Sequence, residues 1–116
     1  MNVKIYHNPK CTKSRETLKL LEARGIDPVV VEYLKHPLTK SEIENLLVLL
    51  NMAPRELLRT KEDDYKKLGL DNPAVTDKMI IAALTKHPKL LERPIVVAGR
   101  KAVIGRPPEN VLSLLK

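Results

Sequence analysis

The sequence predicts an α/β fold in which a mixed four-stranded sheet is flanked by helices. The N-terminal part of the chain holds two strand-like stretches separated by one helical stretch. The C-terminal part holds two more strand-like stretches and a final helical one, and the segment between the two ends has mostly helical periodicity. The predicted order of elements is therefore βαβ, a helical insertion, and ββα.

The first βαβ unit is marked by alternating and β-branched residues. Residues 3–6 alternate and predict the first strand, and residues 28–33 predict the second. The leucines between them predict a helix from about Thr12 to Arg24, which Gly25 ends. Short connections make the two strands parallel with a right-handed crossover. The loop after the first strand then lies at its carboxyl end, where α/β proteins usually bind ligands.

The middle of the chain is predicted to be helical. Thr39 to Glu42 form a capping box, which opens a helix that we expect to stop at Asn51. Further helical segments are expected from Pro54 to Leu58, from Tyr65 to Leu68 before Gly69, and from the capping residue Thr76 to Leu84.

The end of the chain predicts a hairpin, from residues 94–98 and 101–104, followed by a last helix that contains Val111 and Leu114. This order of elements is that of the thioredoxin fold. In that fold a proline, often with a cis peptide bond, precedes the strand nearest the active site, and Pro94 stands at that place. Because no repeat or linker interrupts the pattern, we expect one domain over residues 1–116.

Composition narrows the classes of function. The net charge is +7, but basic and acidic residues are mixed along the chain, and three tyrosines are its only aromatic residues. Without aromatic platforms for bases, we expect no nucleic-acid partner. We also expect no membrane partner, because no apolar run approaches the roughly 20 residues of a span. The start of the chain does not resemble a signal peptide, so we expect a cytoplasmic protein. Three histidines and one distant cysteine offer no metal-ligand spacing.

Cys11 is the only cysteine, and it stands at the predicted turn from strand to helix. The free N–H groups of a helix start favour thiolate, and Lys10, Lys13 and Arg15 add positive charge. We therefore expect a reactive thiol with a pKa below the free value of about 8.5. Because a single thiol forms no internal disulfide, any redox cycle needs an external thiol such as glutathione or a dithiol protein.

Two other cysteine chemistries do not fit these residues. The anion-binding loop of low-molecular-weight phosphatases has an arginine six positions after its cysteine, and here that position is Thr17. Dithiol exchange of the thioredoxin type needs a C-x-x-C motif, and here the second position is Ser14.

Four segments closely resemble the glutaredoxin-coupled arsenate reductase family, of which this chain is identified as a short member. They are residues 6–15, 57–59, 92–97 and 105–107. The resemblance implies reduction of arsenate to arsenite through an arsenic–sulfur adduct on Cys11, which glutathione and glutaredoxin resolve. No bound cofactor is implied, and glutathione is an external co-substrate.

The resemblance also implies roles for individual residues. Cys11 would be the nucleophile, and Arg59, Arg93 and Arg106 would be catalytic residues that bind the oxyanion. His7, Ser14 and Arg15 would belong to the substrate site and support the thiolate and its loop; His7 either hydrogen-bonds the loop or carries protons. Three arginines also suit the chemistry itself, because a thiolate that attacks an oxyanion needs fixed positive charge, and guanidinium binds tetrahedral oxyanions in a bidentate way.

Two alternatives remain open at this point. One is a transcription regulator with the thioredoxin fold that binds RNA polymerase, for which three converging arginines have no use. The other is a monothiol, glutathione-dependent reductase of mixed disulfides, in which the arginines would bind the carboxylates of glutathione. Three further arginines are expected to be ordinary surface residues: Arg24, Arg55 and Arg100.

Overall fold

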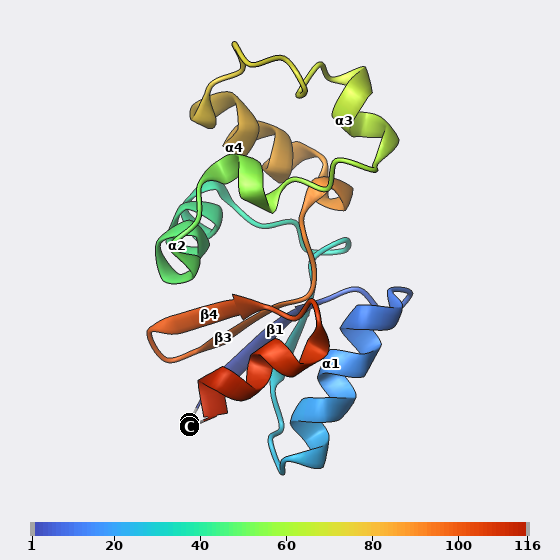
Figure 1. Ribbon diagram of the computed structural model, residues 1–116, viewed down its shortest axis with the longest axis vertical. Helices are drawn as coiled ribbons and strands as arrows, with labels where there is room; N and C mark the ends of the chain where they lie inside the picture. Colours follow the sequence, from blue (N-terminus) through green and yellow to red (C-terminus); the bar gives the residue numbers. More distant parts are fainter. Residues whose placement is uncertain (1, 116) are drawn as a thin grey trace. The chain divides into compact units, whose positions relative to one another are not determined.

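Strands from both ends of the chain form one mixed, four-stranded sheet in the computed structural model, which describes residues 2–115 (Figure 1). The strands are β1 (Val3–His7), β2 (Val29–Glu32), β3 (Ile95–Ala98) and β4 (Lys101–Ile104), in the order β2-β1-β3-β4. Strand β1 is parallel to β2 and antiparallel to β3, and β3 is antiparallel to β4. The predicted parallel βαβ unit and the C-terminal hairpin are therefore confirmed.

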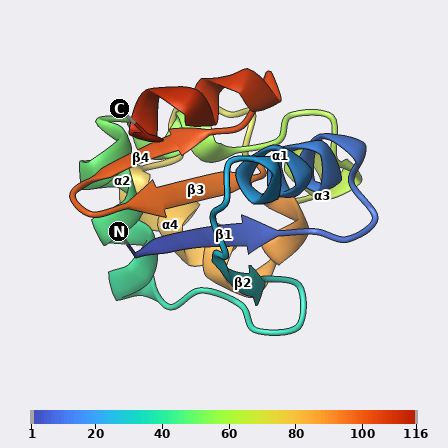
Figure 2. The same ribbon diagram turned by 90° about the horizontal axis from the view of Figure 1, so that it is seen from below.

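Two helices cover one face of this sheet, namely α1 (Thr12–Ala23) and the C-terminal helix η3 (Pro108–Leu115) (Figure 2). Strand residues that pair across β1 and β3 supply the sheet side of the core, and the helices supply the rest. The core consists of Val3, Ile5, Leu21, Val96, Ala98, Val111 and Leu114. Burial of these apolar side chains fixes α1, and with it the loop between β1 and α1, on the sheet.

The last helix is a 3₁₀ helix throughout. The sequence predicts a helix here and does not specify its type. With three residues per turn, positions i and i+3 lie in line, so Val111 and Leu114 both face the core and are buried. The helix begins directly after Pro107, which places its first turn beside the segment that joins it to β4.

The chain divides into two compact units, one made of both chain ends, up to His36 and from Arg93, and the other of Pro37–Glu92. The sheet belongs to the first unit. The second unit is helical, as predicted, with α2 (Lys40–Leu50), η1 (Pro54–Leu57), α3 (Asp63–Lys67), α4 (Asp77–Lys86) and η2 (Pro88–Leu90). Within it, α4 packs against α2, η1 and η2. The described residues hold no helix long and apolar enough to cross a membrane.

Local signals in the second unit act as predicted. Thr39 and Glu42 form both hydrogen bonds of the capping box, and Asn51 ends α2 in the left-handed conformation with φ of 55°. Thr76 caps α4. The short helix α3 begins at Asp63, two residues before the predicted start, which places two aspartates in its first turn, where acidic residues are favourable.

Arg55 is not an ordinary surface residue, and that expectation was wrong. Its guanidinium donates hydrogen bonds to the carbonyl oxygens of Leu70, Asn72 and Val75, at 2.9 to 3.0 Å. It thereby holds the loop between α3 and α4 against η1. Arg24 and Arg100 are exposed, as expected.

Candidate active site

Cys11 is the N-cap residue of α1, and its loop is held by its own backbone and by one buried asparagine. The Cys11 N–H donates to the carbonyl oxygen of Asn8 at 3.0 Å, and the Lys10 N–H donates to Asn8 Oδ1 at 3.0 Å. Asn8 is buried, whereas Cys11 is partly exposed. The loop is therefore anchored by a buried side chain, whereas Cys11 itself stays partly exposed.

Ser14 and His7 support this loop from beneath. Ser14 Oγ lies 2.6 Å from His7 Nδ1 and accepts a hydrogen bond from the Asn8 N–H at 3.0 Å. Both side chains are buried, and burial is the main cause that lowers the pKa of His7; Arg15 acts in the same direction and Glu32 opposes it. Of the two roles left open for His7, these contacts favour the hydrogen-bonding one over proton transfer. The expected place of His7 and Ser14 in the substrate site stays a prediction.

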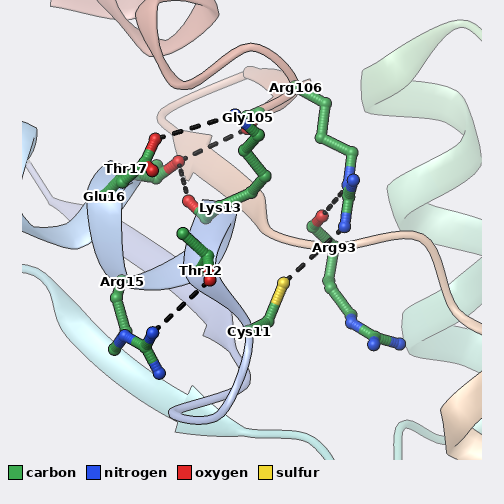
Figure 3. A network of polar contacts seen from close by, with 9 residues as sticks. All are labelled: Cys11, Thr12, Lys13, Arg15, Glu16, Thr17, Arg93, Gly105 and Arg106. Atoms are coloured by element: carbon green, nitrogen blue, oxygen red, sulfur yellow. Dashed lines mark hydrogen bonds and ion pairs between the residues drawn. The ribbon is translucent and has the colours of Figure 1, made fainter.

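Arg15 binds the same loop from its exposed side. Its guanidinium donates to the carbonyl oxygen of Pro9 at 3.0 Å and to Thr12 Oγ1 at 3.4 Å. Figure 3 shows this side chain beside Thr12, at the start of α1. These bonds hold the loop, and the expected part of Arg15 in the substrate site stays a prediction.

Two arginines from the C-terminal part of the chain act on the Cys11 sulfur. The Arg106 guanidinium donates from one terminal nitrogen to Cys11 Sγ at 3.6 Å and from Nε to the carbonyl oxygen of Arg93 at 2.7 Å (Figure 3). The side chain and the charge of Arg93 also act on the Cys11 thiol, whose pKa they lower. Arg93 directly precedes Pro94, whose peptide bond is cis, as expected; the Arg106–Pro107 bond is cis as well, which was not predicted.

These groups lower the pKa of the Cys11 thiol. Burial opposes the shift and is the largest single influence, but it is outweighed by the backbone N–H of Ser14, by the Arg93 hydrogen bond, and by the charges of Arg93 and Arg106. The predicted direction and the predicted contribution of the helix start are thus confirmed. The expected contributions of Lys10, Lys13 and Arg15 are not found, because the positive charge at the sulfur comes from distant parts of the sequence.

A close contact between Thr17 and Gly105 sets the position of the segment that carries Arg106. Thr17 is fully buried, and its hydroxyl lies 2.8 Å from the carbonyl oxygen of Lys13 and 3.4 Å from that of Gly105. A Cβ atom at Gly105 would lie 2.6 Å from Thr17 Oγ1 and 2.9 Å from Pro94 Cγ. In the sequence, Thr17 served only to exclude a phosphatase loop. The one local sign of this contact is that a glycine, Gly105, directly precedes an Arg-Pro pair.

Arg59 lies in the second unit. Its backbone N–H donates to the carbonyl oxygen of Leu90 at 2.7 Å. Its guanidinium forms ion pairs with Glu62 at 3.4 Å and with Glu92 at 3.7 Å. Its expected part in binding the oxyanion stays a prediction. Residues 2–115 contain no cluster of three or more histidine, cysteine or acidic residues that could hold a metal ion.

Known proteins resemble this chain over nearly its whole length. It is 53% identical over 97% of its length to an uncharacterised protein, YfgD, of Escherichia coli, covering 96% of that protein. It is 49% identical to an arsenate reductase of Neisseria meningitidis, with 97% of each chain covered. The solved structure of an arsenate reductase from Vibrio cholerae matches with a TM-score of 0.96 at 49% identity, covering 98% of both chains.

These similarities confirm the α/β, thioredoxin-like fold and the resemblance that the four sequence segments indicated. The family model described as the ArsC family matches residues 6–114. Since that match includes Cys11, Arg93 and Arg106 and nearly every element of the fold, the chain belongs to the ArsC family.

Proposed function

We propose that this protein reduces arsenate to arsenite, with the Cys11 thiolate as nucleophile and an external thiol as reductant. The observation that carries the proposal is the Arg106 guanidinium, which donates a hydrogen bond to one partly exposed sulfur whose pKa Arg93 and Arg106 both lower. A thiolate and a tetrahedral oxyanion repel each other, so such a site needs fixed positive charge at the point of attack. Arginine supplies that charge at any physiological pH and matches the oxygens with its planar fork.

The chemistry balances with two thiols from outside the protein. In the first step the thiolate displaces a hydroxyl group of hydrogen arsenate, which takes up a proton from the solvent and leaves as water, and an arsenic(V)–sulfur bond forms without a change of oxidation state. A glutathione thiolate then attacks the Cys11 sulfur. The arsenic–sulfur bond breaks with its electron pair on arsenic, which leaves as arsenite, and a Cys11–glutathione disulfide forms. Glutaredoxin reduces this disulfide by thiol exchange and restores the thiolate.

Different residues have different proposed roles in the first step. Arg106 contacts the nucleophile and Arg93 lowers its pKa, and we propose that both bind oxygens as negative charge builds on them. The backbone N–H of Ser14 stabilises the thiolate before attack. We propose Arg59 as a third oxyanion ligand on the basis of the family resemblance, with residues 1–116 working as one domain.

Further support comes from the names of the relatives. The 49% identical protein of Neisseria meningitidis and a 47% identical protein of Haemophilus influenzae are both called arsenate reductase. Because the chain has a single cysteine and forms no internal disulfide, it needs an external thiol, and the family resemblance implies that glutathione and glutaredoxin supply it. Such a cycle fits the cytoplasm, where thiols are kept reduced.

A coupled assay tests the proposal. Oxidation of NADPH is followed with glutathione, glutathione reductase and glutaredoxin present, before and after arsenate is added, and arsenite is measured directly. We expect arsenate-dependent turnover that is lost in Cys11→Ser, because a hydroxyl is far less nucleophilic than a thiolate at neutral pH. Turnover of a glutathionylated peptide without any arsenite formation would instead identify a reductase of mixed disulfides.

A further inference from the structure

Besides the contact between Thr17 and Gly105, a side chain from the first turn of η3 also holds the segment that carries Arg106. Asn110 Nδ2 donates hydrogen bonds to the carbonyl oxygens of Ile104 and Arg106, at 3.2 and 3.0 Å. The backbone N–H of Asn110 donates to the carbonyl oxygen of Pro107 at 3.0 Å. Although Asn110 is exposed, the two side-chain bonds bind the backbone on both sides of Gly105.

This backbone sets how the Arg106 side chain reaches the sulfur. The guanidinium bridges the Arg93 carbonyl oxygen at 2.7 Å and Cys11 Sγ at 3.6 Å, so its far end depends on where its Cα atom lies. Arg106 is exposed, and a long exposed side chain has many rotamers. A backbone held at two carbonyl oxygens limits the number of these rotamers that bring a terminal nitrogen to the sulfur.

We propose that Asn110 is a positioning residue for the reaction: it fixes the Ile104–Arg106 backbone and thereby keeps the Arg106 guanidinium at the Cys11 sulfur. Asn110 touches neither the sulfur nor, in this mechanism, the substrate, and acts only through Arg106. The kinetic consequences rest on the proposed arsenate reduction. The effect on the thiol itself does not.

The first test measures the thiol without any arsenate. The rate of Cys11 alkylation by iodoacetamide is followed against pH in the wild type, Asn110→Ala, Arg106→Ala and the double variant. We expect Asn110→Ala to raise the thiol pKa in the same direction as Arg106→Ala and by less. In the double variant Asn110→Ala should add nothing, since residues that act through one group are not additive. An unchanged pKa in Asn110→Ala, or a further shift in the double variant, would overturn the proposal.

Two more variants separate positioning from a general loss of structure. Ser113→Ala removes a hydrogen bond from Ser113 Oγ to the Asn110 carbonyl oxygen, at 2.9 Å in the same helix, but leaves the amide contacts intact. It should titrate like the wild type; a shift as large as that of Asn110→Ala would assign the effect to η3 as a whole. Asn110→Gln keeps the amide one methylene further out and should recover part of the shift. If Asn110→Ala does not fold, the thiol pKa of Asn110→Gln is compared with that of the wild type instead.

The second test uses steady-state arsenate reduction. Asn110→Ala should raise KM by roughly three- to tenfold, the range expected from the loss of one or two net hydrogen bonds. Ser113→Ala should keep the wild-type KM. An unchanged KM in Asn110→Ala would contradict the kinetic part of the proposal. If the wild type does not reduce arsenate at all, the proposed function fails, and the alkylation experiment still decides the role of Asn110.

Discussion

The substitution Gly105→Ala tests whether the contact between Thr17 and Gly105 positions the Arg106 segment. The new Cβ atom would lie 2.6 Å from Thr17 Oγ1 and 2.9 Å from Pro94 Cγ, both closer than real Cβ contacts allow. Neither neighbour can move aside freely, because Thr17 is fully buried and Pro94 is a buried, rigid ring. The backbone of residues 104–106 must therefore shift away from α1.

The magnitude follows from the cost of adding one methyl group to a packed interior. Overpacking of this kind typically costs about 1 to 3 kcal/mol, which is a factor of roughly 5 to 150 in the ratio of folded to unfolded protein. A shift of the backbone also moves the Arg106 guanidinium, which reaches the sulfur at only 3.6 Å in the wild type. We expect the thiol pKa to rise and arsenate turnover to fall along with stability.

Urea unfolding and the pH dependence of Cys11 alkylation measure the two effects. The double variant Thr17→Ala/Gly105→Ala provides the matched comparison, because it removes the atoms at 2.6 and 3.1 Å from the new methyl group and keeps the Pro94 contact at 2.9 Å. It should be more stable than the sum of the two single changes predicts. Wild-type stability and thiol pKa in Gly105→Ala, or strictly additive effects in the double variant, would refute the reasoning.

The remaining predictions concern the sulfur and its neighbours. The midpoint of Cys11 alkylation should fall below the free value of about 8.5; a midpoint at or above it would contradict the stabilised thiolate. Because the folded pKa is lowered, the thiolate contributes stability that is present above the unfolded pKa and lost as pH falls through the folded one. Unfolding free energy should thus rise with pH between these two values, and Cys11→Ser should remove that rise in urea titrations. Arg93→Ala and Arg106→Ala should each cost about 2 to 4 kcal/mol of transition-state stabilisation in kcat/KM, with lysine restoring only part, whereas the exposed Arg100→Ala should match the wild type; equal behaviour of all three would favour the regulator alternative. Ser14→Ala should destabilise by about 1 to 3 kcal/mol, since it leaves a buried N–H group without its acceptor; a thermal melt that matches the wild type would contradict this.

The order of elements and most of their ends could be predicted from the sequence because they depend on local chemistry. Glycine or asparagine ends a helix in the left-handed conformation, as Gly25 and Asn51 do, with φ of 76° and 55°. The capping box at Thr39 needs only residues three positions apart. Alternation and β-branching located all four strands, and the position of Cys11 at a helix start followed from the first two elements.

What the sequence left undecided was which charges reach the sulfur. The predicted sources were neighbours in the chain, but Arg15 is engaged with the loop carbonyl of Pro9, whereas Arg106, 95 residues away, donates to the thiol. The family resemblance named Arg93 and Arg106 as oxyanion ligands and did not imply that they also lower the pKa of the thiol. That effect requires the hairpin of β3 and β4 to pair with β1.

The same reason explains the supporting contacts that sequence reasoning missed. Thr17 meets Gly105 across 88 positions, and the role of Asn110 depends on the turn between β4 and η3. The sequence predicted an ordinary surface residue at Arg55, but in the structure its guanidinium binds three carbonyl oxygens of the loop after α3. By itself the sequence determined the order of the elements and the position of Cys11 at a helix start, since both follow from residues close together in the chain. Only the tertiary structure decided the electrostatics and the packing at the sulfur, because charges and close contacts depend on distance in space.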